Sequence, residues 1–289
     1  MLTVQIVNGL MEGMMLFLIA SGLTLIFGVS RIINFAHGSL YMLGAFLTYQ
    51  LVPLFSDGSL LGFAVAVLLG AVLAAAVGAL FEMAVLRRIY RAPELMQLIV
   101  TIALVLIVRD LVRLVWGPNN VSVSMPDALA GAVQIGDSFF PTFQFAIFGA
   151  GLLVVALMIA IIRFTRAGVL LRAATDDRGM VALLGIDQRR IFTATFAAGS
   201  FLAGLAGGLA SPFGNVNYLL DTEVIVAAFI VVVIGGLGNL YGALAGALAV
   251  GVIKSLGVLY FPRLAMVLIF LVMAAVLLVR SMGRRELQR

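Results

Sequence analysis

Few polar side chains in this sequence could bind or react, and four of them lie together near its start. Residues 30–46 read SRIINFAHGSLYMLGAF, in which Arg31, Asn34, His37 and Ser39 fall within nine residues. His37 is the only histidine among 289 residues. Histidine can act as a general base and serine as a nucleophile, so this polar cluster raises the question of acid–base or covalent chemistry.

The rest of the sequence offers such chemistry no partners. The chain contains no cysteine, which excludes thiolate catalysis and iron–sulfur clusters. A single histidine argues against a metal site, and no G-x-x-x-x-G-K-[ST] phosphate loop is present. We therefore expect no catalytic residue, no metal ligand and no cofactor, and we do not expect an enzyme.

The composition is that of a membrane protein. Hydrophobic residues make up 63% of the chain and charged residues 11%, whereas a soluble domain has about 25% charged residues. Residues 60–81 carry no charge, and a helix needs roughly 20 apolar residues to cross a bilayer. The apolar runs are continuous rather than alternating, so they predict an all-α, polytopic integral membrane protein in one domain, residues 1–289.

Nine hydrophobic segments follow one another along the chain. They lie at 3–29, 38–54, 60–86, 95–116, 142–163, 191–212, 222–236, 239–260 and 263–280. The second is short, and only a glycine cluster separates the seventh from the eighth. The sequence therefore predicts eight or nine transmembrane helices.

The basic residues between these segments predict the orientation. Alternate gaps hold fourteen of them: Arg31, Arg87, Arg88, Arg91, Arg163, Arg166, Arg172, Arg178, Arg189, Arg190, Arg280, Arg284, Arg285 and Arg289. The opposite gaps hold only Arg263. Basic loops stay in the cytoplasm, so we expect a cytoplasmic C-terminus and, with nine spans, an N-terminus on the opposite side of the membrane. Topology thus explains the net charge of +5, and we expect lipid rather than nucleic acid as a partner.

Several charged residues fall within or near the predicted spans: Glu12, Glu82, Arg109, Asp110, Arg113 and Lys254. Such residues usually face a cavity or a partner. Asp110 and Arg113 share a helical face and could pair. We expect Glu82 and Arg113 to reach outward to the membrane interface. Glu12 lies deeper in its span and is a candidate for a transport path.

Two interrupted spans are candidates for a substrate path built from half-helices. The polar cluster interrupts one span, and a glycine cluster interrupts another. SLYMLGAF (39–46) is echoed by NLYGALAGA (239–247), which suggests an internal inverted repeat. The candidate path residues are Glu12, Asn34, His37, Ser39, Gly235, Gly236, Gly238 and Asn239. The alternative is a structural turn, in which Asn34 or Ser39 caps the next helix.

Two loops are long enough to have a role of their own. The external loop, 117–141, is rich in turn-forming residues and predicts a small outer cap. The cytoplasmic loop, 164–190, contains LLRAATDDRGMVALLGI (170–186), which reads as a short amphipathic helix, and Asp187 then begins a new helix. The helix could lie on lipid or dock on a soluble partner, and its paired aspartates favour the partner.

Three motifs carry a family resemblance. GVLLRAATDDRGMVALLGID (168–187) resembles the coupling segment of permease subunits of bacterial branched-chain amino-acid ABC transporters. GLTLIFGVSRIINFAHGSLYMLGAF (22–46) is similar to the signature of the LivH-type subunit, and VVVIGGLGNLYGALAGA (231–247) also looks like that family. The three motifs occur in the family's order and are spread over residues 22–247, most of the length of the chain.

The resemblance implies a protein of the bacterial inner membrane, with its N-terminus in the periplasm and with several partners. A second permease subunit would complete a heterodimer, two cytoplasmic ATPase subunits would supply energy, and a periplasmic solute-binding protein would deliver substrate near loop 117–141. The coupling role falls on Arg172, Ala173, Asp176, Ala182, Leu184, Gly185 and Ile186. The implied function is import of branched-chain amino acids. Two alternatives stay open, namely an ABC permease for urea, short amides or another small polar solute, and a stand-alone secondary transporter or channel.

Overall fold

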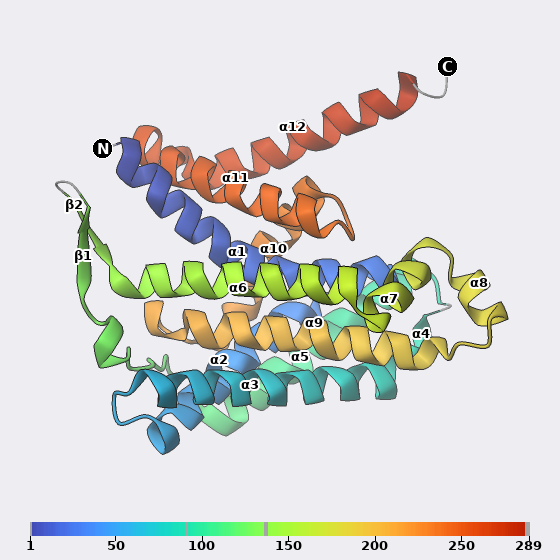
Figure 1. Ribbon diagram of the computed structural model, residues 1–289, viewed down its shortest axis with the longest axis horizontal. Coiled ribbons are helices and arrows are strands. Elements are labelled where there is room, and N and C mark those ends of the chain that lie inside the picture. The colour runs from blue at the N-terminus through green and yellow to red at the C-terminus, as the bar shows by residue number, and fades with distance from the viewer. Residues whose placement is uncertain (1, 91, 136–137, 287–289) are drawn as a thin grey trace.

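All nine hydrophobic segments contain a helix in the computed structural model, which describes residues 2–90, 92–135 and 138–286 (Figure 1). From the N-terminus, the helices are α1 (Leu2–Ser30), α2 (Ala36–Phe55), α3 (Leu60–Phe81), α4 (Arg87–Ile89), α5 (Glu94–Trp116), α6 (Thr142–Phe164), α7 (Arg166–Asp176), α8 (Arg178–Leu183), α9 (Gln188–Ala210), α10 (Leu220–Gly235), α11 (Leu240–Tyr260) and α12 (Ala265–Glu286). A π-helical turn, η1 (Glu82–Leu86), joins α3 to α4. Short 3-10 turns are η2 (Asp127–Leu129), η3 (Ser211–Phe213) and η4 (Pro262–Leu264).

Within the described residues, six of these helices are long and apolar enough to cross a membrane. They are the helices α1, α2, α3, α6, α9 and α11, with α3 counted through α4 and α9 through η3. The other three hydrophobic segments form helices of a different character. Helix α5 carries four charged residues, α10 has only 16 residues, and the apolar part of α12 is the short stretch Val267–Leu278. The coordinates therefore support a polytopic helical protein with six evident spans.

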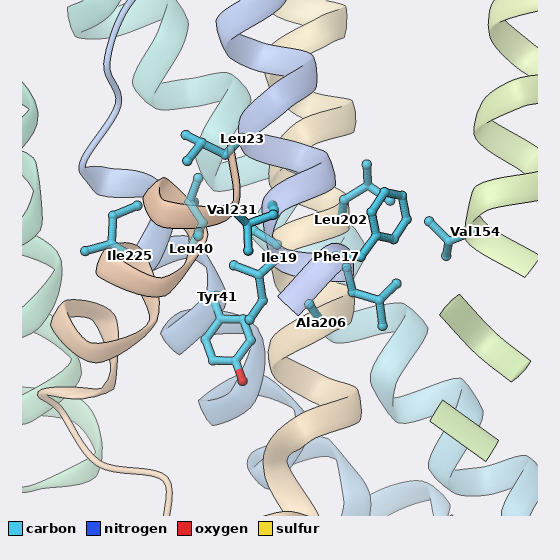
Figure 2. Packing of buried hydrophobic residues seen from close by; sticks show 14 of the residues in the cluster. Phe17, Ile19, Leu23, Leu40, Tyr41, Val154, Leu202, Ala206, Ile225 and Val231 are labelled. Carbon is cyan, nitrogen blue, oxygen red and sulfur yellow. The ribbon is translucent and has the colours of Figure 1, made fainter. Parts of the chain in front are cut away.

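Helices α1 and α2 form the centre of the bundle. Helix α1 packs against α6, α9, α10 and α11, and α2 packs against α3, α5, α9 and α10. Figure 2 shows Leu40 of α2 and Ile225 and Val231 of α10 beside Ile19 and Leu23, which lie well inside α1. Among the described residues, buried apolar side chains from eight helices meet in one core: α1, α2, α3, α5, α6, α9, α10 and α11.

Small residues let these helices approach closely, as the density of glycine and alanine in the sequence suggests. A side chain at Gly44 would overlap the backbone of Gly204, and one at Gly207 would overlap the carbonyl oxygen of Tyr41. These contacts hold α2 against α9. Helix α1 and helix α11 cross in the same way, at Gly13 and Ala247.

The two long loops lie at opposite ends of the bundle (Figure 1). Helices α7 and α8 lie at the end where α1 finishes. Strands β1 (Ala132–Ile135) and β2 (Ser138–Pro141) form an antiparallel hairpin at the other end, with Ala132 opposite Pro141. The described residues do not include residues 136–137 of that loop. They also do not include two of the basic residues used to predict the orientation, Arg91 and Arg289.

Candidate functional site

Helix α2 begins inside the bundle rather than at its edge. Arg31 ends α1 with a φ of 53°, and the chain then turns back. Asn34 Oδ1 accepts a hydrogen bond from the Ala36 backbone N–H at 3.1 Å, and His37 Nε2 donates one to the Ile19 carbonyl oxygen at 3.0 Å. Ile19 lies eleven residues before Ser30, the last residue of α1, which is about 16 Å of helix. The start of α2 is therefore deep in the protein.

Helix α10 also begins at this depth. The chain reaches it from the end of α9, which lies toward the opposite end of the bundle from the end of α1 (Figure 1). Gly208, near the end of α9, lies against Thr48 of α2. Asp221, in the first turn of α10, instead contacts Ser39, which lies nine residues before Thr48 in α2. Ser39 Oγ donates a hydrogen bond to Asp221 Oδ2 at 3.3 Å. A side chain at Gly38 would overlap the Asp221 carbonyl oxygen. The N-terminal ends of α2 and α10 thus meet in the interior.

A buried ion pair lies at this meeting point. Arg109 Nη2, from α5, donates to Asp221 Oδ1 at 2.8 Å and to Thr222 Oγ1 at 2.6 Å. Asp221 is 1% exposed and Arg109 is 22% exposed. The positive ends of two helix dipoles further favour a carboxylate here. Sequence reasoning missed this pair because the two residues are 112 positions apart and Asp221 was assigned to a loop.

The polar cluster forms the turn between α1 and α2, and its side chains also form a buried network of hydrogen bonds. Asn34, His37 and Ser39 are all 0% exposed. The prediction that Asn34 or Ser39 caps the next helix is wrong, because the N-cap of α2 is Phe35, which has no side-chain cap. Asn34 instead bonds within the turn that leads into α2, and Ser39 bonds to Asp221. A path lined by these residues stays a prediction, because none of them reaches an open cavity in this conformation. His37 Nδ1 has no hydrogen-bond partner within the described part of the chain.

The glycine cluster has a similar local role at the start of α11. Asn239 is the N-cap of α11, and its Oδ1 accepts a hydrogen bond from the Gly242 N–H at 3.0 Å. Gly236 and Gly238 have φ values of 97° and 79°, which side chains disfavour. A side chain at Gly235 would overlap the backbone of Gly242. The tight turn between α10 and α11 explains these glycines.

The charged residues of the spans are mostly paired between helices. Glu12 of α1 forms an ion pair with Lys254 of α11, and both side chains are more than a third exposed. Asp110 and Arg113, which share a helical face and could have paired, form no ion pair among the described residues. Arg113 instead lies over the Tyr218 ring, 5.7 Å from its centre, and Asp110 is exposed.

The expectation that Glu82 reaches outward is also wrong. Glu82 is 0% exposed, because the π-helical turn η1 points its side chain toward α9. Arg87 Nη2 lies 3.1 Å from Glu82 Oε2, and Tyr90 and Thr193 donate further hydrogen bonds to the same carboxylate. This network joins the end of α3 to the first turns of α9.

The predicted amphipathic helix is broken into two, α7 and α8. Asp177 separates them, and its Oδ1 accepts a hydrogen bond from the Met180 N–H at 3.0 Å. Ala174 and Val181 are 2% and 1% exposed and pack toward the bundle. Arg31 Nη2 donates to the Thr175 carbonyl oxygen at 3.3 Å, so the end of α1 is fastened to α7.

Gly185 ends α8 in a Schellman turn. Its φ is 74°, and the Ile186 N–H bonds to the Val181 carbonyl oxygen at 3.3 Å, five residues back. This turn leaves Leu183 and Leu184 83% and 69% exposed. The prediction that Asp187 starts a new helix is confirmed, because its Oδ1 accepts from the Arg189 N–H at 3.0 Å.

The other residues to which the coupling role was assigned lie around this turn. Arg172 donates a hydrogen bond to the Ile162 carbonyl oxygen at the end of α6. Ala173 is partly buried, Asp176 is exposed, and Ala182 lies in α8. The residues are thus close in the fold, on one end of the bundle.

An apolar groove runs between α3, α6 and α9. Its volume is about 960 Å³, and its lining includes Phe63, Leu153 and Leu202. A binding site needs a few placed polar groups in an apolar cavity. The lining offers little besides Thr195 and Arg190 near one end. The groove is therefore suited to hydrocarbon and not to a charged solute.

Comparison with known proteins gives a consistent picture over the whole chain. The family model for "Branched-chain amino acid transport system / permease component" matches residues 5–277. The high-affinity branched-chain amino acid transport system permease protein LivH of Salmonella typhimurium is 30% identical over 99% of this chain and 96% of its own length. BraD of Pseudomonas aeruginosa, named for the same system, is 30% identical over 99% of this chain and 97% of its own length. No solved structure is significantly similar.

Proposed function

Since this chain belongs to the family of permease components of branched-chain amino acid transport systems, we propose that it is one membrane-spanning subunit of an ABC importer. The importer moves aliphatic amino acids into the cell. A second permease subunit completes the pore, two cytoplasmic ATPase subunits drive it, and a periplasmic binding protein delivers the substrate. The chain itself is not an enzyme, which agrees with the absence of a phosphate loop from its sequence.

The observation that carries this proposal is the end of the bundle formed by α7 and α8. Met180, Leu183 and Leu184 are 55%, 83% and 69% exposed there, although they are large and apolar. Exposed apolar side chains in such a group are typical of a protein interface. The polar residues Asp176 and Asp177 beside them suit a soluble partner better than anionic lipid. An ATPase subunit is the partner that the family resemblance implies.

The hydrogen bonds between α7 and the long helices could transmit a displacement of the α7–α8 end to the membrane-spanning part of the bundle. Arg31 fastens α7 to the end of α1, and Arg172 fastens it to the end of α6. The network around Glu82 joins α3 to the start of α9. ATP-driven displacement of α7 and α8 would therefore reach four long helices. We propose that these helices shift around the interior start of α2, and so open the path alternately to each side.

The proposed topology has nine membrane segments. The α7–α8 end, 164–190, lies in the cytoplasm together with the C-terminus, as the distribution of basic residues indicates. The hairpin end, 117–141, lies in the periplasm with the N-terminus and contacts the binding protein. The membrane is the bacterial inner membrane. Helix α10 is a half-helix, which agrees with its 16 residues and interior start.

The residues we assign to the path are those at the two interrupted segments. They are Asn34, His37, Ser39, Gly235, Gly236, Gly238 and Asn239, together with Glu12. Half-helix ends offer backbone groups and dipoles to a solute at mid-membrane. Aliphatic substrate side chains would meet the apolar residues around them.

The alternative solutes, urea and short amides, have no support from the named relatives, which are all called branched-chain amino acid permeases. Uptake of labelled leucine into proteoliposomes holding the complete transporter tests the substrate. We expect excess valine or isoleucine to suppress the uptake, and excess urea or acetamide to leave it unchanged. Suppression by urea, with none by valine, would overturn the proposed substrate.

A further inference from the structure

The α5–α10 face, defined by Ile102, Leu106, Arg109, Thr222, Glu223 and Val226, combines exposed apolar side chains with polar and charged ones at a depth where lipid would be apolar. We propose that this face lines the substrate path and that Arg109 binds the carboxylate of the amino acid. The assignment rests on the proposed function for the identity of the ligand, but not for the position of the path. Neither Arg109 nor any other residue of this face was among the candidate path residues.

The depth of the face follows from its contacts. The Trp116 ring of α5 lies 5.4 Å from the Phe46 ring of α2. Arg109 lies seven residues before Trp116, and Ser39 lies seven residues before Phe46. Each is therefore about 10 Å from the contact between the two rings, toward the N-terminus of its own helix. Both meet Asp221 there. The face is therefore near the middle of the bundle, level with the interior start of α2.

Charged side chains at this depth require an aqueous or protein environment. Thr222, Glu223 and Asp110 are exposed on α5 and α10, and neither carboxylate has an ion-pair partner among the described residues. A charge facing hydrocarbon is costly, and charged residues in spans normally face a cavity or a partner. The α5–α10 face therefore does not face lipid.

Another face of the same subunit is apolar and lacks such charged residues. Leu69 and Leu73 of α3 and Leu153 and Leu157 of α6 are 39% to 60% exposed, and the apolar groove lies between these helices. Helices α3, α6 and α9 lie at the front of Figure 1, with α5 behind them. Both faces expose apolar side chains, but α3 has no charged residue and α6 has only Arg163 near its end. The path therefore belongs on the α5–α10 face, which has charged residues in its middle.

Arg109 retains donors for a ligand. Its Nη2 is bonded to Asp221 and Thr222, and its Nε is buried in this conformation with no hydrogen-bond partner among the described residues, whereas the side chain as a whole is 22% exposed. A guanidinium carries five N–H donors and binds carboxylates in a planar, two-bonded geometry. Ser39 and the Thr222 backbone N–H also donate to Asp221, so that carboxylate does not depend on Arg109 alone. Glu223, on the same face, has the charge that suits the ammonium of an amino acid.

Cysteine labelling tests the position of the path. The chain has no cysteine, so Val226→Cys on the α5–α10 face and Leu153→Cys on the α3–α6 side each introduce one thiol. The complete transporter is reconstituted, and a charged, membrane-impermeant methanethiosulfonate is applied. We expect Val226→Cys to react at least tenfold faster than Leu153→Cys, because the reagent needs water. Equal rates, or a faster reaction at Leu153→Cys, would overturn the assignment whatever the substrate is.

A double variant tests the contact with the carboxylate. Arg109→Gln alone leaves Asp221 as an uncompensated buried charge and is expected to impair assembly. Arg109→Gln with Asp221→Asn removes both charges, so we expect normal assembly and ATP hydrolysis but at least tenfold less leucine uptake. Wild-type uptake by the double variant would show that the pair is only structural. Absence of leucine uptake by the unmodified transporter would instead count against the proposed function and leave the labelling result intact.

Discussion

A series of substitutions at Gly185 tests whether the α7–α8 end couples ATP hydrolysis to transport. At this position a side chain strains the backbone but meets no neighbouring atom, so the effect of backbone strain can be measured without a steric clash. The φ of 74° at Gly185 lies in the left-handed region, and a Cβ placed on it would have no atom within 4 Å. A substitution therefore strains the turn without creating a clash. We consider the series Gly185→Asn, Gly185→Ala and Gly185→Val.

The expected magnitudes follow from the cost of left-handed backbone. Alanine there costs about 1–2 kcal/mol, while asparagine tolerates the conformation better. A cost of about 1.4 kcal/mol lowers the population of the turn about tenfold. A β-branched residue is a stronger outlier. If the turn presents Leu183 and Leu184 to the ATPase, uptake per ATP hydrolysed should stay within about twofold of wild type for Asn and fall about tenfold for Ala and further for Val.

The assay measures leucine uptake and ATP hydrolysis in the same proteoliposomes. Gly149→Ala is the matched control, since a Cβ at Gly149 also meets nothing within 4 Å and its φ is not positive. Wild-type coupling for Gly185→Val would refute the reasoning, and so would an equal defect for Asn and Ala.

Three further predictions concern stability, measured as thermal denaturation of the purified protein in detergent. Glu82→Ala removes a fully buried partner of Arg87, so we expect a loss of about 3 kcal/mol, and an unchanged melting temperature would contradict the network. Gly207→Leu forces α2 from α9 at Tyr41 and should lower stability by about 1–3 kcal/mol or more, whereas Gly149→Leu should be nearly neutral. Asn239→Ala removes the cap of α11 and should cost about 1 kcal/mol, and a loss no larger than for a surface alanine would refute its role.

Much of the fold was accessible from the sequence because membrane helices must satisfy their own backbone. Continuous apolar runs located every hydrophobic helix, and Asp187 marked the start of α9 correctly. The break between α7 and α8 was missed, because the helix-forming residues around Asp177 read as one helix. The helix propensities of neighbouring residues do not predict this break, because it is stabilised by the packing of Val181 against the bundle.

The interior site was only half accessible. The polar cluster was found because its residues lie close together in sequence. Its partners were not, because Arg109 and Asp221 come from distant helices and meet only in the folded bundle. Glu82 was placed at the membrane surface for a similar reason, since the π-helical turn that directs it inward has no sequence signal that we recognised.

The central claim is that this chain moves its substrate only as part of an ATP-driven assembly that docks on α7 and α8. Accumulation of labelled leucine in proteoliposomes, with and without the two ATPase subunits, tests it most directly. The account predicts uptake against a gradient when ATP and every subunit are present, and none when the ATPases are omitted. Full uptake by this chain without the ATPases would contradict the account and identify a stand-alone transporter.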